Sequence, residues 1–254
     1  MNAAASWARP RELRLCPSLL SADFSRLSEE LAAVQRAGAD FLHVDVMDAQ
    51  FVPNLTFGPV LVEACRKLTS LPLDVHLMVV EPLRFLEGFA RAGADHVTIH
   101  LEAMRDGASA AAAARTIRDR GLRPGISVKP GTPIERLLPL LPEFDIALVM
   151  TVEPGAGGQA FLPDSPARIA RVRAAIEAEE LDCLLQVDGG IGPSTIRAAA
   201  DAGADTFVAG HSVFRAPDPD APGGPPHPAA ALRALRAALR GTPSPGHDRP
   251  PARA

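Results

Sequence analysis

Acids and imidazoles placed two residues apart end two short apolar stretches of this chain. His43 and Asp45 belong to the first stretch and Asp74 and His76 to the second, while a third stretch ends at Asp188 before two glycines. Residues i and i+2 of a β-strand share one face, so each pair would point the same way. Such groups are costly on a buried strand face unless something satisfies them. We therefore predict that they converge at strand ends, where they could bind a divalent metal and leave room for a substrate.

The donor types narrow the choice of metal. Imidazole nitrogen together with carboxylate oxygen suits Zn²⁺, and also Mn²⁺, Fe²⁺ or Co²⁺. We expect one divalent cation, with Zn²⁺ first and the other three as alternatives. Asp74 shares a face with His76 but lies deeper, so it would either orient a ligand or be a buried structural carboxylate. His100, at the end of a later strand pattern, is a weaker candidate for the site.

An internal repeat organises the elements that must position these side chains. Ala-Gly-Ala-Asp occurs at 37–40, 92–95 and 202–205, each time between a helical pattern and an apolar strand pattern. The glycine is a helix C-cap signal. The first offset is 55 residues and the second is twice as long. If 55 residues hold two strand–helix units, eight units need roughly 220 residues, which fits a (β/α)8 barrel.

The other elements follow the same spacing. We predict strands at 13–17, 41–46, 73–78, 96–101, 124–128, 146–151, 184–188 and 206–210. We predict helices at 26–37, 82–92, 166–180, 193–202 and 229–240. Strands that alternate with helices indicate a parallel sheet. The expected fold class is therefore α/β, a single-domain (β/α)8 TIM barrel, whose active site would lie at the C-terminal strand ends.

The domain organisation follows from composition. We expect a flexible N-terminus at 1–12 and a barrel at 13–240. The barrel would carry a Pro-rich insertion at 216–228, and residues 241–254 would be a disordered tail.

Charge and cysteine content exclude several classes of function. The chain has 254 residues, of which 47% are hydrophobic and 22% charged, with a net charge of −4. This charge gives no electrostatic reason to bind nucleic acid or an anionic membrane. The three cysteines form no CxxC pair, which argues against a disulfide framework and favours the reducing cytoplasm. We also expect neither a signal peptide nor a membrane span.

Glycine clusters follow three neighbouring strand patterns. They are the segment 154–159, Gly189-Gly190 and Gly210-His211. Barrels often bind phosphate at the loops after strands seven and eight, through backbone N–H groups that glycine lets approach closely. The sequence therefore predicts a phosphate site beside the metal site. It has no GxxxxGK[ST] motif, which argues against nucleoside triphosphate hydrolysis.

Seven ordered motifs resemble those of the ribulose-phosphate 3-epimerase family. They are PSLLSADF at 17–24, HVDVMD at 43–48, FVPNLTFGP at 51–59, DVHLM at 74–78, EPGAGGQAF at 153–161, VDGGI at 187–191 and VAG at 208–210. The resemblance runs from about Leu15 to Phe214. It implies an isomerase that converts D-ribulose 5-phosphate to D-xylulose 5-phosphate at C3, in the pentose phosphate pathway. It also implies a sugar-phosphate partner and a homo-oligomer.

The resemblance further implies roles for individual residues. The metal ligands would be His43, Asp45, His76 and Asp188. Asp45 and Asp188 would also be the two acid/base catalysts. The substrate contacts would come from Ser18, His76, Met47, Met78, Met150, Gly155, Ala156, Gly157, Gly158, Gly189, Gly190, Gly210 and His211.

The chemistry of epimerisation makes sense of two carboxylates. Inverting one carbon requires a proton to leave one face and another to arrive on the opposite face. A carboxylate with an unperturbed pKa of about 3.9 is a weak base toward carbon, and general-base catalysis contributes only ~10²–10⁴-fold. The larger share would come from a cation that stabilises the enediolate as a Lewis acid. We therefore expect metal-assisted 1,1-proton transfer, in a site that Met47, Met78 and Met150 keep dry.

Three positions depart from the family's pattern. Ala156 stands where a Phe is usual, Gln50 where a His is frequent, and His211 where Ser or Thr is usual. These changes bear on the sugar phosphate that is used, and the loss of a ring at Ala156 would suit a six-carbon substrate such as D-allulose 6-phosphate.

Two further functions are alternatives. A decarboxylase or aldolase would need a catalytic lysine, for which Lys129 is the one candidate near a strand end. A protein of a different class, a non-catalytic sugar-phosphate sensor, would bind the substrate without exchanging its C3 proton.

Overall fold

The computed structural model describes residues 12–217 and 225–240. The predicted N-terminal segment, apart from residue 12, and the predicted tail lie outside the described residues, as does the middle of the Pro-rich insertion. Within the described part, no helix combines the length and apolarity that crossing a membrane would require.

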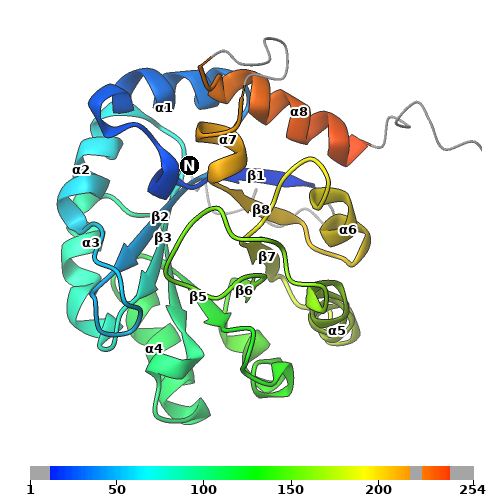
Figure 1. Cartoon of the computed structure of the whole chain (residues 1–254). Coiled ribbons are helices and arrows are strands. Elements are labelled where there is room, and N and C mark those ends of the chain that lie inside the picture. Colours follow the sequence, from blue (N-terminus) through cyan, green and yellow to red (C-terminus); the bar gives the residue numbers. More distant parts are fainter. Residues whose placement is uncertain (1–11, 218–224, 241–254) are drawn as a thin grey trace, which may run out of the picture.

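Eight parallel strands form one sheet in the order β1-β8-β7-β6-β5-β4-β3-β2, with the helices outside it (Figure 1). The strands are β1 (Arg14–Pro17), β2 (Leu42–Met47), β3 (Leu73–Met78), β4 (His96–His100), β5 (Arg123–Val128), β6 (Ile146–Met150), β7 (Leu184–Asp188) and β8 (Thr206–Ala209). An isolated parallel bridge between Ser18 and His43 joins β1 to β2. The single-domain (β/α)8 barrel is therefore confirmed, with strand bounds close to those predicted.

The helices are α1 (Leu27–Arg36), α2 (Pro59–Leu68), α3 (Leu86–Ala92), α4 (Gly107–Arg118), α5 (Ser165–Ala178), α6 (Ile196–Asp201), α7 (His211–Phe214) and α8 (Pro228–Arg240). The helix predicted from residue 193 begins later, at Ile196. The reason is a turn in which the Thr195 hydroxyl accepts from the Gly192 N–H at 2.9 Å and contacts the Gly190 carbonyl at 2.7 Å.

Between β5 and β6, two 3₁₀ helices replace the α-helix that eight regular strand–helix units would place there. They are Ile134–Arg136 and Leu138–Glu143. Pro139 and Pro142 lie in the second of them, where each proline removes a backbone donor that an α-helix would need. Four more 3₁₀ turns occur in the loops, at Leu19–Ser21, Phe24–Arg26, Pro82–Phe85 and Leu101–Ala103.

The Ala-Gly-Ala-Asp repeat has a structural role at the end of the barrel opposite the C-terminal strand ends. Its glycines follow α1, α3 and α6 with left-handed backbones, at φ +88° for Gly38, +92° for Gly93 and +109° for Gly203. Each repeat aspartate accepts a backbone N–H from the beginning of a neighbouring strand, at its first or second residue, and pairs with an arginine. The pairs are Asp40 with Leu15 and Arg236, Asp95 with Leu73 and Arg66, and Asp205 with Leu185 and Arg173.

Inside the barrel an apolar layer lies below a polar one. Cys16, Phe41, Ile146, Leu184 and Val208 form a buried cluster separate from the main core between sheet and helices. Above this cluster the inward positions of β2, β3, β4 and β7 carry polar side chains. This packed apolar cluster thus lies beneath the polar side chains at the C-terminal strand ends.

The buried His96 should make the stability of the barrel depend on pH. Burial lowers the pKa of its imidazole to about 4, compared with about 6.5 in an unfolded chain. Its contribution to stability is therefore complete above pH ~6.5 and is lost as pH falls toward 4, because the unfolded chain binds a proton that the folded protein does not. Between pH 7 and pH 5, the free energy of unfolding of the wild type should fall by about 2 kcal/mol more than that of His96→Phe. Urea unfolding at both pH values measures this difference, and equal losses in the two proteins would contradict it.

Candidate active site

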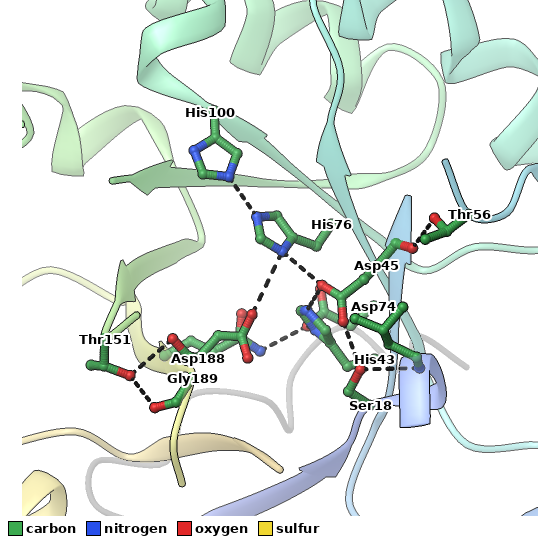
Figure 2. A network of polar contacts seen from close by, with 12 residues as sticks. Ser18, His43, Asp45, Thr56, Asp74, His76, His100, Thr151, Asp188 and Gly189 are labelled. Atoms are coloured by element: carbon green, nitrogen blue, oxygen red, sulfur yellow. Dashed lines mark hydrogen bonds and ion pairs between the residues drawn. The ribbon is translucent and has the colours of Figure 1, made fainter. Parts of the chain in front are cut away.

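The predicted ligands meet at the C-terminal ends of three strands. His43 and Asp45 come from β2, His76 from β3 and Asp188 from β7, and one donor atom from each lies within 4.8 Å of the others. Asp45 Oδ1 lies 3.3 Å from His43 Nε2 and 3.0 Å from His76 Nδ1, and Asp188 Oδ2 lies 3.8 Å from His76 Nδ1 (Figure 2). The strand register causes this convergence, since Asp45 is the direct neighbour of His76 and His43 of Asp74.

The orientation of His43 suits a metal ion. Its Nδ1 lies 2.8 Å from Asp74 Oδ2, which also accepts the Gln186 amide at 2.7 Å. His43 Nε2, which faces the other ligands, is buried and has no hydrogen-bond partner among the described residues. A buried nitrogen of this kind, next to two carboxylates and a second imidazole, fits a divalent cation. Asp74 therefore takes the position of a group that orients a ligand, one of the two roles considered for it.

His76, the second imidazole of the group, is contacted at its other nitrogen by residues that face away from the cavity. His76 Nε2 lies 2.8 Å from His100 Nε2, and the two rings stack with centroids 4.9 Å apart. His100 Nδ1 lies 3.2 Å from Glu102 Oε2. His100 thus lies behind a ligand, without belonging to the four-residue group itself.

The two candidate catalysts differ in electrostatic environment. Burial raises the pKa of Asp188 to about 6, and the nearby Asp45 carboxylate contributes to the rise. Burial would also raise the pKa of Asp45, but the charge of the nearby His43 and the hydrogen bond with His76 Nδ1 outweigh it and hold that pKa well below its usual range. In the absence of a cation, Asp188 therefore takes up a proton more readily than Asp45 does.

A cavity of about 210 Å³ opens above these groups. It is lined by all but one of the residues predicted to contact substrate: Ser18, Met47, Met78, Met150, Gly155, Ala156, Gly157, Gly158, Gly189, Gly190, Gly210 and His211, together with Asp45 and Asp188. The exception is His76, which lies beneath the cavity floor with no exposed surface. Ser18 Oγ donates to Asp45 Oδ2 at 2.6 Å, so it holds the carboxylate in place.

Two glycines after β7 bring the backbone to the cavity wall. Gly189 and Gly190 have φ of +115° and +64°. A Cβ would lie 2.3 Å from the Val152 side chain at Gly189 and 2.4 Å from the Phe161 nitrogen at Gly190. Only glycine fits both positions without strain. The turn is held by Thr151, whose hydroxyl lies 2.6 Å from the Gly189 carbonyl.

The glycine-rich loop after β6 contacts the loop after β2. Asn54 Nδ2 donates to the Gly155 carbonyl at 3.2 Å, and Gln159 Nε2 donates to the Ala156 carbonyl at 2.8 Å. The His211 ring lies beside Gly158. Gln50 is exposed and lies outside the lining of the cavity. Of the three positions that depart from the family's pattern, Ala156 and His211 can therefore reach a ligand in this cavity.

Lys129 does not take the place that a decarboxylase or aldolase would require. Its Nζ lies 3.8 Å from the centroid of the Phe51 ring and donates to the Phe51 carbonyl at 3.5 Å. Lys129 is outside the lining of the cavity.

Sequence reasoning missed several residues around the site. Gln186 supports Asp74, Glu102 supports His100, and Ser21 and Val152 line the cavity. Gln186 lies two residues before Asp188 on β7, so the same two-residue spacing could have identified it. Glu102 follows its strand inside a 3₁₀ turn, where no periodic pattern marks it.

Comparison with known proteins gives a consistent result. A family model described as the ribulose-phosphate 3 epimerase family matches residues 14–214. Proteins named ribulose-phosphate 3-epimerase include one from Mycobacterium tuberculosis, 50% identical over 87% of this chain and 91% of its own. Another, from Synechocystis, is 46% identical over 82% of this chain and 90% of its own. The cytoplasmic isoform of Oryza sativa is 45% identical over 81% and 89% of the two chains.

Solved structures of low sequence identity share the fold. KGPDC from Streptococcus mutans has a TM-score of 0.64 at 18% identity and covers 90% of this chain and 98% of its own. A 3-hexulose-6-phosphate synthase has a TM-score of 0.63 at 20% identity, with 90% and 99% of the two chains covered.

Proposed function

Because this chain belongs to the ribulose-phosphate 3-epimerase family, a family of isomerases, we propose that it interconverts D-ribulose 5-phosphate and D-xylulose 5-phosphate. The observation that carries this proposal is the pair Asp45 and Asp188, two carboxyls that border one cavity from different strands, β2 and β7. Two such carboxyls can act on the two faces of one carbon.

The proton transfer divides between the two carboxyls. Asp45 Oδ1 faces the two ligand imidazoles and Asp188 Oδ2 faces His76. The second oxygen of each group is therefore the atom we assign to exchange the C3 proton. In one direction Asp45 removes the proton while Asp188 returns one to the other face, and the roles reverse in the other direction. Ser18 keeps Asp45 oriented during the transfer.

We propose one divalent cation held by His43, Asp45, His76 and Asp188, with Zn²⁺ as the first expectation and Mn²⁺, Fe²⁺ or Co²⁺ as alternatives. When bound, it would supply Lewis-acid stabilisation of the negative charge that develops on the substrate oxygens. Met47, Met78 and Met150, each only 2% exposed, would limit water access to the reacting carbon.

We assign the substrate phosphate to the glycine-rich end of the cavity, where segment 154–159, Gly189-Gly190 and Gly210 meet. Gly189 and Gly190 line this end of the cavity, so their backbone N–H groups are candidates to bind an anion, as in the phosphate sites of other barrels. We also propose a cytoplasmic location, which the name of the rice relative gives for that protein, and a homo-oligomeric assembly.

The test of this proposal is exchange of the C3 proton of D-ribulose 5-phosphate in D₂O, with metal-free protein reloaded with one defined metal at a time. We expect deuterium at C3 together with D-xylulose 5-phosphate. Binding of the sugar phosphate without exchange at C3 would instead indicate a non-catalytic sensor.

The length of the sugar is a separate prediction. We expect kcat/KM for D-ribulose 5-phosphate to exceed that for D-allulose 6-phosphate by at least roughly tenfold, because an extra hydroxymethylene has to be fitted between fixed phosphate and metal sites. Ala156→Phe is the matched variant, since it restores a ring at the loop, and it should widen the preference. A wild-type preference for the six-carbon sugar would contradict this prediction.

A further inference from the structure

A chain of three side chains leads from the proposed metal site to the outside of the barrel. His76 Nδ1 faces the other ligands, and its Nε2 lies 2.8 Å from His100 Nε2. His100 Nδ1 lies 3.2 Å from Glu102 Oε2. Both imidazoles are fully buried, whereas 18% of the Glu102 side chain is exposed. Between two neutral imidazoles that meet Nε2 to Nε2, one nitrogen must carry the proton and the other must accept it.

Glu102 decides which nitrogen carries that proton. Its Oε1 accepts the Lys129 backbone N–H at 2.8 Å and the Thr132 hydroxyl. Its Oε2 is left facing His100 and, as a carboxylate oxygen, can only accept. His100 must therefore donate from Nδ1, which leaves its Nε2 as an acceptor. His76 must then donate from Nε2, and its Nδ1, which lies 3.0 Å from Asp45 Oδ1, is the nitrogen left for a cation.

The two imidazole ligands thus use opposite nitrogens. Asp74 faces His43 Nδ1 directly and leaves Nε2 for a cation. His76 has the opposite orientation: its Nε2 faces away from the proposed metal site, and on that side a carboxylate, Glu102, acts on it only through the His100 imidazole. We propose that Glu102 and His100 are positioning residues that set the tautomer of His76, so that Nδ1 is available to the cation. This inference rests on the proposed function in one respect only, the presence of that cation.

Glu102→Gln should reverse the chain of hydrogen bonds while keeping its shape. Two donors, from Lys129 and Thr132, face one side of residue 102 and would hold the amide oxygen there. The amide NH₂ would then face His100 Nδ1 and donate to it. His100 would in turn donate from Nε2 to His76, which would carry its proton on Nδ1, where the cation should bind.

A second pair of variants tests His100 itself. His100→Phe keeps a ring against His76 and Phe51 but removes the acceptor, whereas His100→Gln places an amide oxygen near the former Nε2 position. We expect Phe to weaken metal binding and Gln to recover most of it. A purely packing role would give the opposite order, because Phe preserves the stacked ring better.

The measurement combines Co²⁺ affinity with ¹⁵N spectra of the histidines in the metal-free full chain. We expect Glu102→Gln to bind Co²⁺ about 10- to 100-fold more weakly, with the proton between the two imidazoles moved from His76 Nε2 to His100 Nε2. Glu63→Gln, an exposed residue on α2, is the matched control and should match the wild type. A loss caused only by the missing negative charge would leave the tautomer unchanged.

The outcomes separate this inference from the proposed function. A wild-type protein that binds Co²⁺ through His76, but whose affinity and tautomer are the same in Glu102→Gln, would overturn the positioning role and leave the epimerase proposal intact. A wild-type protein that binds no Co²⁺ would overturn both the cation and this inference, whatever the ¹⁵N spectra of the variants.

Discussion

Replacing Asp188 with asparagine is expected to lower kcat/KM for epimerisation by roughly 10²- to 10⁴-fold, because an amide can neither accept nor return the C3 proton. The substitution keeps the size of the side chain, and the Asp188 carbonyl that contacts Thr151 is part of the backbone. The fold should therefore be retained. The assay is coupled turnover of D-ribulose 5-phosphate at saturating metal, so that weaker metal binding does not account for the loss.

Isotope exchange gives this variant a sharper readout. If Asp45 and Asp188 act on opposite faces, Asp188→Asn should still exchange the C3 proton of the one epimer whose proton faces Asp45, without forming the other epimer. Asp45→Asn should show the opposite preference. Asp201→Asn, at the exposed end of α6, is the matched control and should turn over normally. Exchange of both epimers at the wild-type rate in Asp188→Asn would rule out the two-base assignment.

Removal of the divalent cation should have an effect of similar size. A cation that stabilises charge on the substrate contributes several kcal/mol, so we expect chelation to lower kcat by about 10³-fold or more. Adding back one of the four candidate metals should restore the rate. The same cation should stabilise the folded state by about 4 kcal/mol at 1,000 times its Kd, which thermal unfolding with and without metal would detect.

His43→Gln provides the control for metal removal. It takes away the buried Nε2 nitrogen, which has no hydrogen-bond partner in the described part of the chain, so chelator and metal should both lose their effect on stability. Full activity in protein shown by elemental analysis to contain no metal would contradict the Lewis-acid role.

The sequence allowed the strands and the four clustered side chains to be predicted for a physical reason. A strand alternates its faces strictly, and neighbouring parallel strands end at the same side of the sheet, so spacing alone brings Asp45 close to His76. The regular strand–helix alternation fails between β5 and β6, because four prolines within 13 residues, at positions 130, 133, 139 and 142, lack the backbone N–H groups that an α-helix needs.

The contacts of His76 with His100, and of His100 with Glu102, could not be predicted in the same way. His100 was only a weaker candidate, because its contact with His76 depends on ring orientations and on the stagger between β3 and β4. Glu102 depends on a turn beyond the strand. Tertiary packing decides both of these features, and a single sequence carries no periodic signal for them.

The bridge between Ser18 and His43 has a mechanical consequence. Every other neighbouring pair of strands is joined by a ladder, whereas β1 and β2 are joined at their carboxyl ends by this one bridge and by the hydrogen bond from Ser18 to Asp45. At the other end, Asp40, just before β2, bonds Leu15 of β1 through its backbone and its side chain. The carboxyl end of this junction therefore consists of residues that would hold cation and substrate, so occupying the site would also strengthen the contact between the first and the second strand.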